Sequence, residues 1–217
     1  MILIPVKNLN QAKQRLSAVL DQAARTRLAQ AMLHDVVEAV ASWGNRPDVA
    51  LVSCDSFALG LAAKFGFEVI ADPANISETD AIAMATRVCE MRGVDYTIVI
   101  PADIPLIQAW ELQRIMEAAP VEGTVLAPAG DGRGTNAIFR RPAGLFPLRF
   151  GNDSFKPHLA AAKATGKPCI VLSLPGIAVD VDNPSDLRQL AELPGETRAQ
   201  RLARQWDLTD LPLAANE

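Results

Sequence analysis

The sequence predicts an α/β fold: a single domain with three α/β/α layers around a mostly parallel sheet. Short β-branched and apolar runs alternate with segments of helical periodicity, which is typical of βαβ units with right-handed crossovers. The 217 residues can bury the core of one large domain without disulfides or structural metals. We expect this domain to span residues 1–208, followed by a loose C-terminal tail at 209–217.

The expected elements follow one another along the chain. Helices are expected over 21–43, 57–65, 81–91, 109–119, 155–166, 184–193 and 196–206. Strands are expected over 2–6, 49–54, 67–71, 96–100, 125–128, 137–140, 170–172 and 177–183.

Composition excludes several classes of protein. A formal charge of −4, a pI near 5.3 and no Lys/Arg run argue against a nucleic-acid or acidic-membrane binder. Three distant cysteines fit reduced thiols, and two remote histidines give a zinc site little support. With neither a signal peptide nor an apolar run of about 20 residues, we expect a cytoplasmic protein.

Asp103 follows the most strongly predicted strand. The run 97–100 is β-branched, and Pro101 cannot continue a central ladder, so the strand stops abruptly. Ligands of open α/β sheets bind outside the carboxyl ends of the strands, where Asp103 is expected. Alternatively, Asp103 only caps the helix expected near Leu106.

The loop after the first strand carries three cations, Lys7, Lys13 and Arg15, and no glycine. The motifs GxGxxG and GxxxxGK[ST] are both absent, so a Rossmann fingerprint and a P-loop are not supported. Side-chain cations can hold a polyphosphate in place of backbone amides. The alternative is a solvated loop surface.

Asp180 and Asp182 are expected on one face of the strand 177–183, about 6 to 7 Å apart. Two like charges on an apolar strand are unfavourable unless a cation lies between them. Asp182 could instead cap the helix that begins at Pro184, but this leaves Asp180 unexplained. Together with Asp103 they form a set suited to Mg²⁺ beside a nucleotide's phosphates, so nucleotidyl transfer is the leading reaction class.

Two later segments suit an anion. The loop 130–136 holds three glycines that can turn backbone amides toward a ligand, although a hairpin turn would explain them equally. The segment 150–158 places amides and a hydroxyl at a helix N-terminus, although Ser154 could be only its cap and His158 only a first-turn residue. The polar loop 72–80 could contact a purine edge, and capping by Ser77 or Thr79 is the stronger interpretation.

The sequence resembles the CofC/FbiD guanylyltransferases, which make the activated precursor of a deazaflavin redox coenzyme, coenzyme F420. The similarity spans nearly the whole chain. It depends on Ile4-Pro5-Val6-Lys7 with Ala12-Lys13-Gln14-Arg15-Leu16, Pro101-Ala102-Asp103-Ile104-Pro105-Leu106, Asp131-Gly132-Arg133-Gly134-Thr135-Asn136, Phe150-Gly151-Asn152-Asp153-Ser154-Phe155 with His158, and Asp180-Val181-Asp182-Asn183-Pro184.

This resemblance implies a nucleotide-diphospho-sugar transferase-like, Rossmann-like α/β fold. It also implies transfer of GMP from GTP to a small phosphorylated carboxylic acid, with Mg²⁺ as cofactor and pyrophosphate released. The implied roles are Mg²⁺ ligation by Asp103, Asp180 and Asp182; catalysis by Asp103, Lys7 and Lys13; nucleotide binding by Lys7, Lys13, Arg15, Asp80 and Pro101; and acceptor binding by Thr135, Asn136, Gly151, Ser154 and His158.

The chain departs from the family pattern at one place. Relatives often have Gly-Leu-Asn at the start of the helix after the third strand, whereas this chain has Glu78-Thr79-Asp80. Asp80 could accept hydrogen bonds from guanine N1–H and N2–H₂. The acceptor stays open among 2-phospho-L-lactate, phosphoenolpyruvate and 3-phospho-D-glycerate. Rival interpretations are a pterin or sugar-phosphate nucleotidyltransferase of the same fold and a non-catalytic nucleotide-binding protein, and a homodimer is possible.

Overall fold

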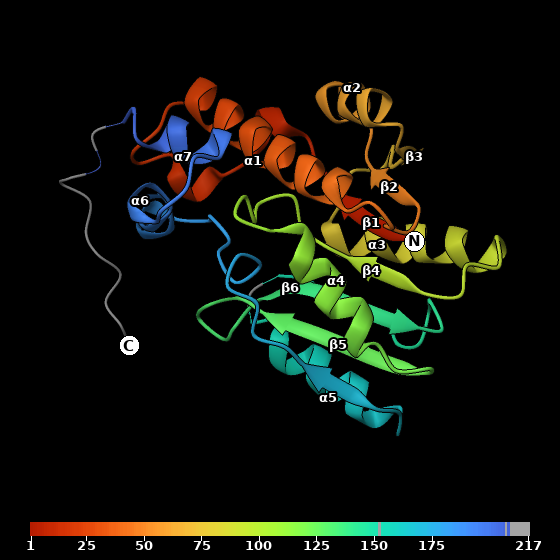
Figure 1. Cartoon of the computed structure of the whole chain (residues 1–217). Helices are drawn as coiled ribbons and strands as arrows, with labels where there is room; N and C mark the ends of the chain where they lie inside the picture. The colour runs from red at the N-terminus through yellow and green to blue at the C-terminus, as the bar shows by residue number, and fades with distance from the viewer. Residues whose placement is uncertain (152, 207, 209–217) are drawn as a thin grey trace.

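A computed structural model, described for residues 1–151, 153–206 and 208, places one seven-stranded sheet at the centre of the molecule (Figure 1). The strand order is β3-β2-β1-β4-β6-β5-β7, and β6 alone runs antiparallel to its neighbours. The strands are β1 (Ile2–Pro5), β2 (Val49–Val52), β3 (Glu68–Ile70), β4 (Thr97–Val99), β5 (Gly123–Pro128), β6 (Thr135–Arg141) and β7 (Cys169–Val171). The predicted α/β class with a mostly parallel sheet is confirmed.

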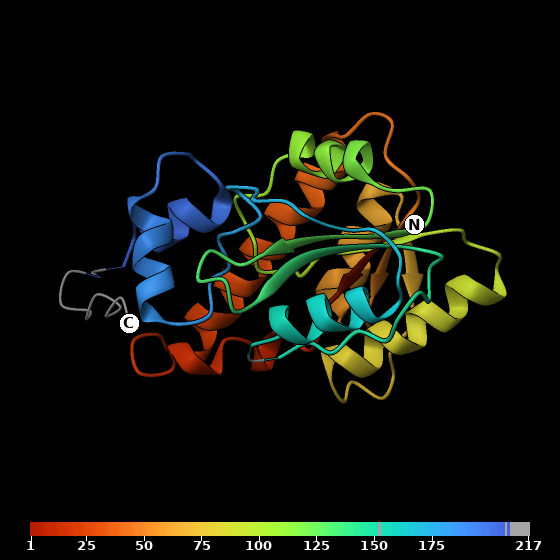
Figure 2. The ribbon, with the colours of Figure 1, turned by 90° about the horizontal axis from the view of Figure 1, so that it is seen from below.

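Helices cover both faces of this sheet. They are α1 (Gln22–Ser42), α2 (Ser56–Phe65), α3 (Glu78–Met91), α4 (Ala109–Ala118), α5 (Phe155–Ala164), α6 (Pro184–Glu192) and α7 (Arg198–Ala203). Strand side chains alternate: Ile2 and Ile4 pack with α1, α2 and α4, whereas Leu3 packs with α3 and α5. Figure 2 shows α4 on one side of the sheet and α3 and α5 on the other, which confirms the three-layer arrangement.

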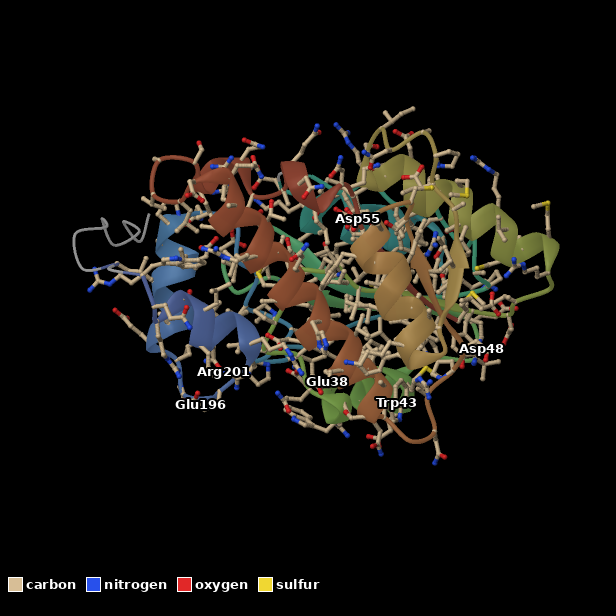
Figure 3. The ribbon with its side chains drawn as sticks, turned by 90° about the horizontal axis from the view of Figure 1, so that it is seen from above. Glu38, Trp43, Asp48, Asp55, Glu196 and Arg201 are labelled. Carbon is tan, nitrogen blue, oxygen red and sulfur yellow. The ribbon has the colours of Figure 1, made fainter. Side chains whose placement is uncertain are left out.

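Helices α6 and α7 form a satellite core with the first half of α1. Leu28 and Met32 of α1 pack with Leu187 and Leu190 of α6 and with the alanines of α7. Figure 3 shows the segment with Glu196 and Arg201 alongside α1, where Glu38 is labelled. The buried Asp35 of α1 accepts the backbone N–H groups of Arg198 at 3.0 Å and Ala199 at 2.8 Å. It therefore caps α7 from another element.

One predicted strand is wrong. Residues 177–183 form a turn and an extended segment outside the sheet. Their backbone bonds go to two different loops: Gly130 donates to the Ala178 carbonyl at 2.8 Å, and Val181 donates to the Asp103 carbonyl at 3.2 Å. The apolar side chains that suggested a strand are buried individually, Ile177 against the main core and Val181 against the satellite core.

Smaller differences concern helix ends. Helix α3 begins at Glu78 rather than residue 81, because the Ser77 side chain accepts the Asp80 N–H and caps it. Helix α7 begins at Arg198 rather than residue 196, because Thr197 caps its start, and it ends at Ala203 rather than residue 206. The predicted tail at 209–217 lies outside the described residues. In the part of the chain that the structure describes, no helix has the length and apolar character needed to cross a membrane.

Candidate active site

Two adjoining pockets open at the carboxyl ends of β1 and β4. The first, of about 360 Å³, lies between the loop after β1 and the loop after β4. The second, of about 690 Å³, continues toward the β5–β6 loop and the start of α5. Their common wall consists of Arg15, Glu78, Pro101, Asp103 and Asp182. The predicted site at this edge of the sheet therefore corresponds to real concave space.

Side-chain hydrogen bonds to the backbone fix the conformation of the loop after β1. The Asn8 side chain accepts the Asn10 N–H and starts a short 3₁₀ turn, and buried Leu9 donates its N–H to Asp55 at 3.0 Å. Asp55 is labelled in Figure 3 at the start of α2. Lys13 has φ of 54°, an uncommon left-handed conformation for a lysine. The chain bends at Lys13 so that its side chain lines the first pocket.

Lys13 joins two loops that are far apart in sequence. Its Nζ donates to Asp103 Oδ2 at 2.6 Å and to Asp182 Oδ1 at 2.9 Å. Burial disfavours the charge on Lys13, but the two carboxylates outweigh burial and hold the pKa of Lys13 above its ordinary value. Arg15 approaches the other oxygen of Asp182 at 3.5 Å. Attraction by Lys13, helped by Arg15, keeps the pKa of Asp182 below its ordinary value.

Asp180 lies on the same extended segment, in the second pocket. Asn136 Nδ2 donates to its Oδ1 at 3.0 Å and to the Ile177 carbonyl at 2.8 Å. Burial, followed by repulsion from Asp103 and Asp182, raises the pKa of Asp180 to about 6 in spite of this hydrogen bond. The three predicted carboxylates are thus close enough to repel one another.

The chemistry of this carboxylate set fits a divalent cation. An ammonium already lies between Asp103 and Asp182, and Asp180 is crowded by negative charge, so added positive charge would relieve the repulsion. Within residues 1–151, 153–206 and 208, no three His, Cys, Asp or Glu side chains stand close enough to hold a metal by themselves. An ion here needs further oxygen ligands, as Mg²⁺ usually takes from water and phosphate.

The second pocket has a hydroxyl-rich end built by Thr135, Gly151 and Ser154. The Ser154 Oγ accepts the Thr135 N–H at 3.1 Å and makes no cap bond to α5, so capping does not account for Ser154. Gly151 has φ of 124°, which glycine adopts without strain. Arg133 and Asp153 form an ion pair of 2.7 Å in the wall of this pocket.

His158 is fully buried behind this pocket rather than exposed on the first turn of α5. Its Nε2 accepts the backbone N–H of Arg149 at 2.9 Å, so its proton is on Nδ1, which lies 3.0 Å from Thr135 Oγ1. His158 therefore donates to the Thr135 hydroxyl and leaves the hydroxyl proton free to point into the pocket. Burial lowers the pKa of His158 to about 4, which keeps the ring neutral.

The remaining predicted residues separate into those inside the pockets and those outside. Lys7 lines the first pocket and contacts Asp72 at 3.1 Å, and Pro101 lines both pockets. Asn136 lines the second pocket. Asp80 is exposed, lines neither pocket and accepts the Ser77 hydroxyl at 2.5 Å.

Sequence reasoning gave Glu78 no role, although this residue lies in the common wall of the pockets. Burial, followed by repulsion from Asp103, raises the pKa of Glu78 to about 8. Its Oε1 is shielded from solvent and has no hydrogen-bond partner. The departure from the family pattern at 78–80 is a sequence signal that includes Glu78, but the sequence-based prediction assigned the base contact to Asp80.

This combination of fold, adjoining pockets and carboxylate–cation cluster defines a nucleotidyltransferase. Residues 1–209 match the family model described as "Guanylyl transferase CofC like", and the chain belongs to that family. The chain is 35% identical over 204 residues to a phosphoenolpyruvate guanylyltransferase of Roseiflexus castenholzii, covering 94% of this chain and 93% of the relative. It is 33% identical over 211 residues to a 2-phospho-L-lactate guanylyltransferase of Methanothermobacter thermautotrophicus, covering 97% and 92%.

Solved structures support the fold. A nucleotide-diphospho-sugar transferase-type structure from Desulfovibrio desulfuricans superposes with a TM-score of 0.75 at 19% identity, covering 94% of this chain and 93% of that chain. A nucleotidyl transferase from Methanothermobacter thermautotrophicus gives a TM-score of 0.58 at 15% identity, covering 94% and 97%. The predicted fold class and the family resemblance are both confirmed.

Proposed function

We propose that this enzyme transfers GMP from GTP to the phosphate of a small phosphorylated carboxylic acid in coenzyme F420 biosynthesis. The observation that carries the proposal is the wall of acidic and basic side chains between two pockets, one lined by Lys7 and Lys13 and the other by hydroxyls and amides. Relatives named for phosphoenolpyruvate and 2-phospho-L-lactate support this class of acceptor. The cytoplasmic location and the homodimer stay predictions.

In this proposal the first pocket binds GTP and the second binds the phospho-acid. An oxygen of the acceptor phosphate attacks the α-phosphorus of GTP, the bond to the β-phosphate oxygen breaks, and pyrophosphate leaves. The attacking phosphate is already anionic, so no general base is required. Lys7, Lys13 and Arg15 neutralise the charge that develops on the leaving pyrophosphate.

Asp103, Asp180 and Asp182 are the residues that would hold Mg²⁺. The ion would supply positive charge to the phosphates at the reacting centre. At the far end of the second pocket, the Thr135 hydroxyl donates to the oxygens of the acceptor, and Gly151 and Ser154 line the same end and hold the acceptor in line. His158 does not touch the acceptor, and it orients the Thr135 hydroxyl from behind.

The test measures pyrophosphate release from GTP and Mg²⁺ with each candidate phospho-acid, a sugar phosphate and a pterin phosphate. Activity with one or more phospho-acids supports the proposal, and activity only with a sugar phosphate or pterin contradicts it. Asp103→Ala should keep the fold and abolish turnover, whereas Asp48→Ala, an exposed residue preceding β2 (Figure 3), should have no effect. Ser154→Ala should raise the KM of the acceptor more than that of GTP.

A further inference from the structure

Glu78 stands out among the acids of the first pocket. Asp103 and Asp182, the other two, are both bound by Lys13. Glu78 Oε1 is the one buried carboxylate oxygen without a hydrogen-bond partner in the described part of the chain. A shielded acceptor without a donor is costly, so Glu78 Oε1 requires a partner from outside the chain, such as a water, an ion or a ligand group.

The surroundings of Glu78 limit what that ligand group can be. Asp103 and Asp182 add negative charge beside it, which Lys13 and Lys7 offset only in part, so Glu78 itself is a poor partner for a phosphate. Besides its charged side chains, the first pocket has apolar walls from Val6, Leu9, Ala12, Ala29, Met32, Pro101 and Ala102. Apolar walls beside Glu78, the acid that Lys13 does not bind, suit a flat ring whose edge carries N–H donors.

Among nucleobases, guanine presents two adjacent N–H donors on one edge, N1–H and N2–H₂. The ionised carboxylate of Glu78 can accept both at once in a bidentate contact, and these two donors, together with a cation held by Asp103 and Asp182, would favour ionisation of a group whose pKa is otherwise raised to about 8. Adenine instead presents a lone pair at N1, which would face the carboxylate oxygen without a proton between them. With Glu78 ionised, the site therefore rejects adenine more strongly than it would by shape alone.

We propose that Glu78 selects guanine by accepting N1–H and N2–H₂ in the first pocket. The proposal rests on the proposed function in that a nucleoside triphosphate occupies this pocket. It moves base recognition from Asp80, which is exposed and bonded to Ser77, to a residue whose carboxyl faces the pocket. Helix α3 holds Glu78 in its first turn, and the Ser77 cap fixes where that turn begins.

The test compares GTP, ITP and ATP in the wild-type protein, Glu78→Gln and Glu78→Leu. Hypoxanthine keeps N1–H and lacks the N2 amino group, so ITP separates the two bonds. The wild-type protein should prefer GTP over ITP about tenfold and over ATP about 100-fold or more. Glu78→Gln should lower kcat/KM for GTP about 10- to 100-fold through KM, change ATP little and leave the acceptor KM unchanged.

Matched controls separate this role from a structural one. Gln has the shape of Glu without its charge, so Glu78→Gln should be at least as stable as the wild-type protein in thermal unfolding. Glu117→Gln, on the exposed surface of α4, should change neither stability nor base preference. An equal loss with all three nucleotides would assign Glu78 to the ribose or a cation and would overturn the inference.

Direct binding distinguishes failure of the inference from failure of the proposed function. Calorimetric titration with GTP, ITP and ATP needs no acceptor and no turnover. If no phospho-acid is guanylylated but Glu78→Gln still removes a GTP preference in binding, the proposed acceptor is wrong and the inference stands. If GTP turnover is present and Glu78→Gln keeps both base ratios, the inference is wrong and the proposed function stands.

Discussion

Replacing Lys13 by Met tests whether an ammonium stabilises the carboxylate cluster. Met has a similar length and no charge, so Lys13→Met removes the two hydrogen bonds to Asp103 and Asp182 and leaves most of the packing. The two carboxylates then repel each other and Asp180 without a cation between them. We expect the folded state to lose stability in the absence of metal ions.

The size of the loss follows from exposure. Removing one member of a buried ion pair costs about 3–5 kcal/mol, whereas an exposed pair contributes about 0–1 kcal/mol. The Lys13 side chain is 10% exposed, but those of Asp103 and Asp182 are 27% and 43% exposed and keep part of their hydration. An intermediate loss of about 2 kcal/mol, or about 4–8 °C in Tm for a chain of this length, is therefore expected.

Thermal unfolding of the wild-type protein and Lys13→Met, with EDTA and with Mg²⁺, provides the measurement. Mg²⁺ should raise the Tm of Lys13→Met more than that of the wild-type protein, because the ion meets carboxylates that no ammonium occupies. Lys163→Met, at an exposed position of α5, is the matched control and should not shift Tm. Equal Tm values in EDTA, or equal shifts with Mg²⁺, would refute the reasoning.

Three further predictions concern stability. His158 has a pKa of about 4 in the folded state and about 6.5 in the unfolded state, so the free energy of unfolding should fall by about 3 kcal/mol as the pH drops from 6.5 to 4. Urea unfolding of His158→Gln at several pH values should lack this part of the loss. The same acid-dependent loss in His158→Gln and the wild-type protein would contradict the prediction. Asp35→Ala should cost about 1–2 kcal/mol of stability and speed hydrogen exchange in α7, because Asp35 accepts two backbone N–H groups there. Glu38→Ala, which removes an exposed carboxylate, is the control and should have neither effect. Unaltered exchange in α7 of Asp35→Ala would count against the capping role. Gly123→Ala should destabilise the protein by at least about 2 kcal/mol, because φ is 137° and a Cβ would lie 2.3 Å from a carbonyl oxygen. Gly60→Ala, inside α2, should instead stabilise it by about 0.5–1 kcal/mol. Urea midpoints of the two variants that move in the same direction would refute this contrast.

The position of Asp103 could be predicted because its signals are local. A β-branched run that ends at Pro101 predicts both a buried strand and the residue at which it stops. The edge of a parallel sheet then provides the site. The same expectation, that ligands bind at the carboxyl ends of strands, applied to β1 predicted a role for the cations in the loop that follows it. The structure places Lys7, Lys13 and Arg15 in one pocket.

Asp180 and Asp182 were brought to the site by a different route from the one predicted. The alternation rule placed them on one face of a strand, but the segment is an extended loop bonded to Gly130 and Asp103. Apolar residues at 177 and 181 are equally compatible with a strand and with a loop that buries single side chains. Whether the segment becomes a strand or a loop depends on the distant residues that it contacts, and a local sequence pattern does not identify those residues.

Glu78 is a residue of the candidate site that the local sequence pattern did not predict. An acidic residue in the first turn of a helix is common because it complements the helix dipole, so it carries no functional signal of its own. Its burial comes from contact with segments of the pockets that lie far away in sequence. Asp80 has the same local setting and is exposed.

The two pockets also explain why overall identity does not rank acceptors. Relatives named for phosphoenolpyruvate and for 2-phospho-L-lactate are similarly close, at 35% and 33% identity. The first pocket is built by the β1 and β4 loops, and the hydroxyl-rich end of the second by the β5–β6 loop and the segment before α5. Because the shared wall separates these ends, we expect substitutions of Arg133 and Asp153 to affect the proposed acceptor site and to leave the proposed nucleotide pocket unchanged.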